Sequence, residues 1–242
     1  MQDLQDKLDQ ITSNTRRLVQ PERLAISEQA IADLFSTGIE DRIKPVGATA
    51  PTFSLPDAAT GKIVSSTDLL ALGPLVLSFF RGRWCPYCVT ELETWRDLYP
   101  EIRRLGAVFA AVSPQNRRQN AFTAEQLEGR PKPNAKFHLP GNTPLPFPIL
   151  SDLDATLAAQ FGIAYTIPAS ARDYFRSILV NIPFANSGKS YDTAPDSAWR
   201  LPMPATFLIR QDATIAFAEA HADFRVHPEP AQIFAALASL PR

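Results

Sequence analysis

The stretch Gly73–Cys88 reads GPLVLSFFRGRWCPYC and indicates the architecture of this chain. It opens with an apolar run that lacks polar alternation, which is typical of a strand buried on both faces of an α/β sheet. The CxxC motif of Cys85 and Cys88 comes next, and residues 90–105 then carry apolar side chains at helical spacing. A second apolar run occupies residues 107–112. We therefore expect two parallel strands joined by a right-handed helical crossover, with the CxxC at the start of the helix.

The residues before this unit predict two amphipathic helices, which form an N-terminal helical extension over residues 1–43. A proline, tolerated in a first helical turn, marks the start of the second helix. The apolar positions of the two helices are Leu4, Leu8, Ile11 and Leu18, then Leu24, Ile31, Leu34 and Phe35. Both helices could pack on their own domain, or they could form a dimer contact. Residues 52–55, bounded by prolines, predict an edge strand.

The residues after residue 112 predict further helices and strands of the same domain, and no second core. We expect a polar helix at 116–128, an irregular proline-rich loop at 130–148, and helices at 153–161 and 169–180. A polar connection then spans 181–200, with a turn at 186–188. The chain closes with strands at 205–210 and 214–218 and a helix at 230–240. Residues 44–242 thus form one α/β domain, with a central mixed sheet flanked by helices.

The composition excludes several classes of protein. The 242 residues are 45% hydrophobic, so general disorder is excluded, and the net charge of −1 lacks the basic excess of a nucleic-acid binder. No apolar run approaches the roughly 20 residues that span a membrane. The N-terminus has no apolar signal core, which favours a cytoplasmic protein. No phosphate-cradling glycine-rich loop is present, and we expect no nucleotide, flavin or metal cofactor.

The CxxC motif carries the chemistry. At a helix N-terminus, unpaired backbone N–H groups and the helix dipole stabilise a thiolate, which attacks peroxides and disulfides. Arg81 and Arg83 add positive charge beside it. A zinc site would need four ligands, and the sequence contains no second CxxC. The alternatives are therefore redox chemistry, which we favour, or an inert pair of structural thiols. The three histidines lack ligand spacing and are expected at the surface: His138, His221 and His227.

Three blocks resemble the thioredoxin-fold redoxin superfamily. They are Gly73–Cys88, FPILSDLDATLAAQFGI at 147–163 and PMPATFLIRQDATI at 202–215. More narrowly, the chain resembles the peroxiredoxin-like (AhpC/TSA-related) proteins that carry a CxxC, over about residues 45–240. The tetrad CPYC is also usual in glutaredoxins, but the surrounding sequence and length differ. The resemblance implies a thioredoxin-like fold and a thiol-dependent antioxidant enzyme.

Two alignments of the site are possible, and they disagree about which sulfur reacts first. Alignment with thioredoxins makes Cys85 the nucleophile and Cys88 the resolving thiol. Alignment with peroxiredoxins places the peroxidatic cysteine on Cys88, and this alignment, together with the downstream blocks, favours Cys88. It also puts Arg81 in place of the family's proline and Cys85 in place of its threonine. The helix geometry favours Cys85, which lies nearer the open N-terminus.

The resemblance implies supporting roles for further residues. The activating arginine expected before the late strand is absent, so Arg81 or Arg83 would replace it. The buried carboxylate that shuttles protons in thioredoxins aligns with Phe79 and is missing too. Pro204 matches the family's cis-proline, which would leave the backbone of Met203 to face a disulfide partner. Trp84 is expected to contact a partner.

The function implied is a peroxidase that reduces hydrogen peroxide or organic hydroperoxides through a Cys85–Cys88 dithiol/disulfide cycle. Thioredoxin, or a glutathione/glutaredoxin-type reductant, would restore the dithiol. The alternatives are a general thiol–disulfide oxidoreductase and a non-enzymatic redox-sensing module. A homodimer is possible, whereas nucleic-acid and membrane partners are not expected. The preferred substrate, the reductant and the role of loop 130–148 stay open.

Overall fold

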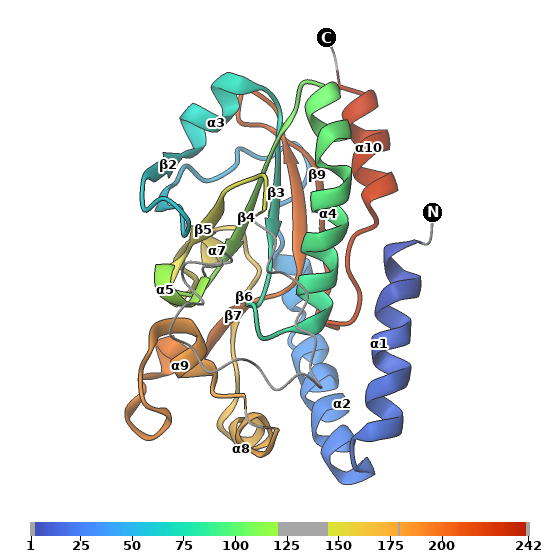
Figure 1. The fold of residues 1–242 in the computed structure, drawn as a ribbon, viewed down its shortest axis with the longest axis vertical. Coiled ribbons are helices and arrows are strands. Elements are labelled where there is room, and N and C mark those ends of the chain that lie inside the picture. Colours follow the sequence, from blue (N-terminus) through green and yellow to red (C-terminus); the bar gives the residue numbers. More distant parts are fainter. Residues whose placement is uncertain (1–2, 121–144, 179, 241–242) are drawn as a thin grey trace.

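The computed structural model describes residues 3–120, 145–178 and 180–240, and Figure 1 shows helices packed around a central sheet. Five strands form this sheet in the order β5-β4-β3-β8-β9. Three of them are parallel, β8 is antiparallel to β3, and β9 is antiparallel to β8. The strands are β3 (Leu75–Phe79), β4 (Val108–Ser113), β5 (Ile149–Ser151), β8 (Ala205–Ile209) and β9 (Ile215–Ala220). The expected parallel pair and mixed sheet are confirmed.

Helices cover both faces of this sheet, and two small antiparallel pairs lie outside it. The helices are α1 (Leu4–Leu18), α2 (Pro21–Ser36), α3 (Ser66–Leu72), α4 (Pro86–Arg104), α5 (Arg117–Asn120), α7 (Thr156–Gln160), α8 (Ala169–Ser177), α9 (Ile182–Ser187) and α10 (Pro230–Ala238). The small pairs are β1 (Ser54–Pro56) with β2 (Ile63–Ser65), and β6 (Ala164–Thr166) with β7 (Arg200–Pro202). Among these described helices, none is long and apolar enough to cross a membrane.

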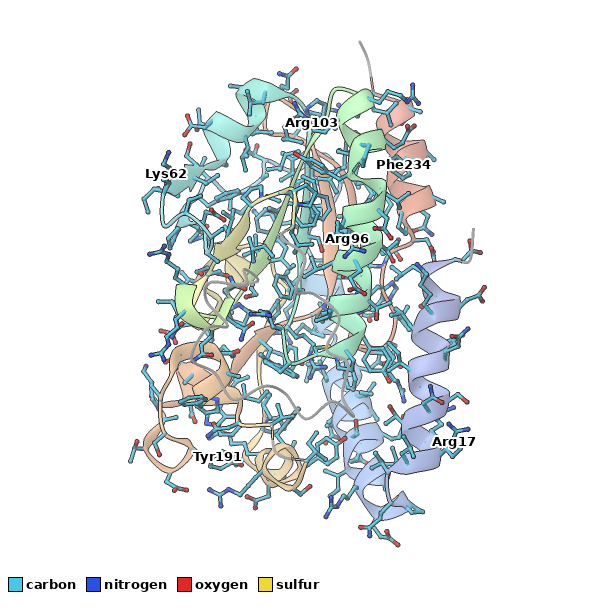
Figure 2. All side chains as sticks on the ribbon, viewed as in Figure 1. Arg17, Lys62, Arg96, Arg103, Tyr191 and Phe234 are labelled. Carbon is cyan, nitrogen blue, oxygen red and sulfur yellow. The ribbon has the colours of Figure 1, made fainter. Side chains whose placement is uncertain are left out.

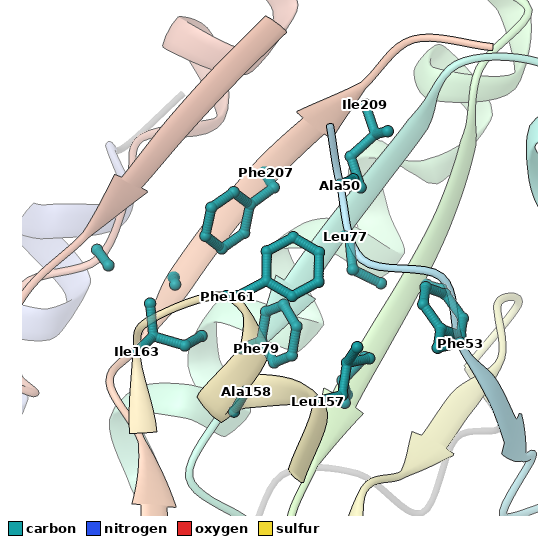
Figure 3. Close-up of a cluster of buried hydrophobic side chains, with 14 of the residues drawn as sticks. Ala50, Phe53, Leu77, Phe79, Leu157, Ala158, Phe161, Ile163, Phe207 and Ile209 are labelled. Atoms are coloured by element: carbon teal, nitrogen blue, oxygen red, sulfur yellow. The ribbon is translucent and has the colours of Figure 1, made fainter. Parts of the chain in front are cut away.

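One face of the sheet packs against α3 and α7 through an aromatic cluster. Phe79 of β3, Phe207 of β8 and Phe161 after α7 meet there, as Figure 3 shows. The ring centroids lie 5.1 Å apart for Phe79 and Phe161 and 4.6 Å apart for Phe161 and Phe207. Side chains alternate between the faces of a strand, so neighbouring residues of β3 point to the opposite side.

The other face packs against α4, α10 and α1. Trp95 of α4 is fully buried there against Phe109 of β4, and its ring also meets Phe234 of α10, which is labelled in Figure 2. Because both faces are covered, every residue of β3 and β4 is buried. This explains the unbroken apolar runs of the sequence.

The two N-terminal helices pack on the rest of the chain to different extents. Leu4 and Leu8 of α1 are buried in the same cluster as α4, whereas α2 has no fully buried residue. Leu18 and Phe35 are exposed, so their expected place on the packed faces was wrong. Leu18 is the last residue of its helix, and the chain turns away there.

Several segments outside the central sheet also differ from the prediction. The predicted polar connection 181–200 contains α9, which Asn181 caps by accepting a hydrogen bond from the Phe184 N–H at 3.1 Å. The predicted turn is the end of this helix, where Gly188 takes the left-handed φ of 72°. Helix α3 and strand β2 were not predicted. Most of the predicted segments 116–128 and 130–148, together with His138, lies outside the described residues.

Candidate active site around Cys85 and Cys88

The CxxC lies where the chain leaves the carboxyl end of β3 and enters α4, as the sequence predicts (Figure 1). Cys85 is the N-cap residue of α4 and Pro86 is its first residue, which tolerates a missing N–H. Arg103 and Arg104 end the helix and complement its dipole. The helix therefore starts four residues earlier than the predicted residue 90, and Cys85 lies at its positive end.

The two sulfurs are unequal. Both cysteines are free and buried, and the Cys88 thiol donates a hydrogen bond to the Cys85 sulfur over an Sγ–Sγ distance of 3.0 Å. Burial acts to raise the pKa of Cys85, but this hydrogen bond and the Arg81 charge outweigh it and lower that pKa to about 6. Burial and the neighbouring Cys85 sulfur raise the pKa of Cys88 well above its usual value. At neutral pH, the pair thus holds a Cys85 thiolate and a Cys88 thiol.

Arg81 supplies a buried positive charge at the pair. Its side chain is buried, its guanidinium carbon lies 4.1 Å from the ring centroid of Phe224, and it interacts with the Tyr165 side chain. The Nε atom has no hydrogen-bond partner among the described residues. A buried guanidinium with an unused N–H can bind a small polar ligand beside the thiolate.

A cavity of about 180 Å³ opens in front of Cys85. It lies between α1, α2, α8 and the start of α4, and Trp84 packs edge-on against Phe175 in its wall, with a centroid distance of 6.2 Å. Cys85 contributes to this wall, whereas Cys88 has no exposed surface. Residues that line the cavity include Arg81, Trp84, Cys85, Tyr87, Phe175 and Phe224. A reactant that enters therefore meets Cys85 first.

A buried polar network, which the sequence analysis did not predict, lies behind the motif. Glu91 of α4 accepts hydrogen bonds from Ser78 Oγ at 3.0 Å and from Trp95 Nε1 at 3.1 Å. Its other oxygen lies 2.7 Å from Nδ1 of His227, a residue that is only 2% exposed. The expectation of a surface position for His227 is wrong, because its loop folds back over α4. His221 is half-buried and pairs with Glu219.

The backbone at Met203 and Pro204 does not have the conformation that the resemblance implied. No peptide bond in the described residues is cis, so the bond before Pro204 is trans, the form that X–Pro bonds ordinarily prefer. Met203 is fully buried, and its N–H donates to the Ile163 carbonyl at 2.8 Å. Strand β7, which pairs with β6, holds this segment in place. The backbone N–H of Met203 is therefore not available to a disulfide partner.

The remaining predicted site residues lie beside the motif. Arg83 is half-buried, and its backbone N–H donates to Oε1 of Gln115 at 2.7 Å. Trp84 lines the cavity, and the Arg81 guanidinium carbon lies 5.0 Å from its ring centroid. Tyr165, Gln115 and Phe224 were missed, since they belong to loops and short strands without a motif. Glu91 follows Cys88 by three residues, a helical spacing that could have placed it on the same side.

These features define a class of protein: an α/β fold with a buried dithiol at a strand-to-helix junction. The sequence profile of the AhpC/TSA family matches residues 46–218, and the chain belongs to this family. Two Mycobacterium tuberculosis proteins are 32% identical over 117 residues, "Putative peroxiredoxin MT1643" in strain CDC 1551 and "Putative peroxiredoxin Rv1608c" in strain H37Rv. These alignments cover 48% of this chain and 65% of each relative. "Putative peroxiredoxin bcp" of Coxiella burnetii is 27% identical over 118 residues, which are 49% of this chain and 66% of that protein.

Solved structures support the fold. The chain aligns with the crystal structure of the peroxidoxin BcpB from Mycobacterium tuberculosis at a TM-score of 0.53 and 24% identity, covering 81% of this chain and 98% of that one. Mycobacterium tuberculosis AhpC aligns with a TM-score of 0.55 and 16% identity, covering 81% of this chain and 93% of the other. The expected thioredoxin-like fold of a peroxiredoxin relative is confirmed.

Proposed function

We propose that this protein is a thiol peroxidase of the peroxiredoxin type in which Cys85 attacks the peroxide and Cys88 resolves the product. The observation that carries the proposal is the position of Cys85. Cys85 is the N-cap residue of α4, its sulfur accepts a hydrogen bond from Cys88 at 3.0 Å, and it lines a cavity that it shares with Arg81. Family membership supports peroxide as the oxidant. The peroxiredoxin alignment favours Cys88 instead, but the geometry supports Cys85.

The reaction balances with two thiols and one peroxide. The Cys85 thiolate attacks the terminal peroxide oxygen, the O–O bond breaks, an S–O bond forms, and the alkoxide leaves as an alcohol (water, from hydrogen peroxide) after taking a proton. Cys88 then attacks the Cys85 sulfenic acid, so that a disulfide forms and water leaves. The proton released when Cys85 ionises completes the alcohol, and the proton of the Cys88 thiol completes the water.

Arg81 would act on the peroxide. Arg81 lines the cavity wall, so its guanidinium suits a hydrogen bond to the peroxide oxygens as charge moves onto them. The same charge favours the thiolate. Arg81 would then take the part of the family arginine that is absent before β8, where Pro204 stands. Arg83, the other candidate, would contribute less.

Access to the thiolate favours a small oxidant over a protein disulfide. Cys85 is only 1% exposed and faces a cavity of about 180 Å³, which admits a hydroperoxide more readily than a protein chain. The buried Met203 N–H also offers no backbone partner to a disulfide-bonded chain. A lowered thiol pKa would nevertheless serve disulfide exchange as well, so general oxidoreductase activity is the competing function.

A coupled assay distinguishes peroxidase activity from general oxidoreductase activity. The reduced protein is given hydrogen peroxide, tert-butyl hydroperoxide or oxidised glutathione, with thioredoxin, thioredoxin reductase and NADPH, and with Cys85→Ser as the control. We expect NADPH consumption with the peroxides to exceed that with the disulfide. Faster turnover of the disulfide would favour the oxidoreductase. Oxidation by peroxide without turnover by thioredoxin or by a glutathione/glutaredoxin system would favour a redox sensor.

A further inference from the structure

The loop before α10 places a second positive group at the thiol pair. His227 is buried, and its two ring nitrogens both have partners within the protein. Nδ1 lies 2.7 Å from Oε2 of Glu91, and Nε2 lies 3.1 Å from the carbonyl oxygen of Phe224. Glu91 belongs to the first turns of α4, the helix that Cys85 caps.

With Glu91 ionised, the hydrogen-bond partners of the ring select its protonation state. A backbone carbonyl can only accept, so Nε2 must carry a proton to make its bond. The Glu91 carboxylate already accepts from Ser78 and Trp95 through Oε1, and its Oε2 accepts from Nδ1. Both ring nitrogens therefore donate, and a ring with two N–H groups is an imidazolium. The neighbouring carboxylate also opposes the effect of burial and raises the pKa of His227.

The imidazolium lies on the loop that covers the start of α4, because Phe224, whose carbonyl it contacts, packs against Tyr87 at a centroid distance of 5.6 Å and lines the cavity with Cys85. Its charge is one of the interactions that lower the pKa of this thiol. Charges in a buried site are poorly screened, so a fixed cation there favours the thiolate, in addition to the larger effects of the Cys88 hydrogen bond and Arg81. The other charged or titratable groups at the pair are Arg81, Tyr87 and Tyr165. Arg81 and Tyr87 line the cavity in front of Cys85, and Tyr165 interacts with Arg81.

We propose that His227, held as a cation by Glu91, is a positioning residue that stabilises the Cys85 thiolate as a fixed charge and transfers no proton. This inference rests on the proposed function, because it takes Cys85 as the attacking sulfur. The absence of proton transfer follows from the geometry: each ring N–H is committed to an acceptor of the protein itself. Glu91 would act through His227 rather than on the thiol.

The direction in which Glu91→Gln shifts the pKa of Cys85 shows whether Glu91 acts through His227 or directly on the thiolate. If Glu91 acted on the thiolate directly, Glu91→Gln would remove a repelling negative charge and lower the pKa of Cys85. If Glu91 holds the imidazolium, the same variant lets His227 become neutral and raises that pKa. His227→Gln should raise it too, but by less than Arg81→Gln, because the Arg81 charge has the larger effect on Cys85. Because the two residues act as one unit, the double variant should raise the pKa of Cys85 no more than His227→Gln alone.

The test is a thiolate titration by ultraviolet absorbance of the reduced protein and of the variants Glu91→Gln, His227→Gln and both together. The matched control is His221→Gln, which breaks the other His–Glu pair and should leave the pKa of Cys85 unchanged. A raised Cys85 pKa in both single variants supports the proposal. An unchanged pKa in folded His227→Gln, or a lowered one in Glu91→Gln, overturns it. An ordinary Cys85 pKa in the unaltered protein would instead contradict the proposed function.

A second measurement needs no variant, should His227→Gln fail to fold. Nitrogen-detected NMR of the histidine-labelled protein reports whether each ring nitrogen carries a proton. We expect two protonated nitrogens on His227 at neutral pH, where a surface histidine has mostly lost its second proton. A His227 ring with one bare nitrogen would overturn the proposal.

Discussion

The thiol of Cys88 donates a hydrogen bond to the sulfur of Cys85 over 3.0 Å, and this bond makes two buried cysteines chemically different. The acceptor sulfur is the helix N-cap and lines the cavity, whereas the donor sulfur lies inside the helix with no exposed surface. A disulfide needs the sulfurs only about 1 Å closer, at the usual S–S length of about 2.05 Å. The pair is thus arranged both for ionisation of Cys85 and for closure after it is oxidised.

The first prediction concerns the ionisation of Cys85. Its pKa of about 6 means that the thiolate is formed at neutral pH and is lost as the pH falls through 6. The rate of alkylation by iodoacetamide should therefore rise with pH to a midpoint near 6, with a second rise only at high pH from Cys88. Cys85→Ser should lose the first step alone. A single transition at the ordinary thiol value of about 8.5 would contradict the electrostatics described here.

The second prediction is that Arg81, rather than Arg83, supplies the guanidinium charge that activates Cys85 and the peroxide. Arg81→Gln removes the buried guanidinium, so we expect a higher Cys85 pKa and a loss of roughly tenfold to hundredfold in kcat/KM for peroxide, the size expected for one charge-assisted hydrogen bond. Arg83→Gln removes the same charge two residues away and is the matched control. Stopped-flow kinetics with hydrogen peroxide gives both values. An equal loss in the two variants, or a larger loss for Arg83→Gln, would count against Arg81.

The third prediction concerns α1, which could pack on its own domain or form a contact between subunits. Leu8 is fully buried against the helices of this chain, so Leu8→Ala should lower the free energy of unfolding by about 2–5 kcal/mol. Leu18 lies on the same helix and is 78% exposed, so Leu18→Ala should change it by less than about 0.5 kcal/mol. Urea denaturation measures both. Similar small effects would mean that α1 does not belong to the core of its own chain.

The elements that the sequence predicts best are those determined by residues close together in the chain. The run at 73–80, the CxxC and the helix after it could be predicted because strand burial, helix caps and helical periodicity are written in neighbouring residues. Helix α9 was missed because its cap, Asn181, and its end, Gly188, lie in a segment whose composition also suits a loop.

The site itself could be predicted only in part. The cysteines and Arg81 belong to one motif, but Glu91 and His227 are 136 residues apart, and only the folded chain brings them together. Without an aligned carboxylate at Phe79, the sequence suggested that the site lacked a buried acid. The structure supplies one from α4 instead, three residues after Cys88. The backbone at Met203 depends on the pairing of β6 with β7, which no local pattern predicts.

The order in which the two sulfurs react decides whether Cys85 is the peroxidatic cysteine. Reduced Cys85→Ser and Cys88→Ser proteins are each treated with one equivalent of hydrogen peroxide, trapped with a sulfenic acid reagent and analysed by mass spectrometry. We predict that Cys88→Ser consumes the peroxide and carries a sulfenic acid on Cys85, because the thiolate and the cavity remain, while Cys85→Ser stays unreactive. A sulfenic acid on Cys88 in Cys85→Ser, with Cys88→Ser unreactive, would contradict the account.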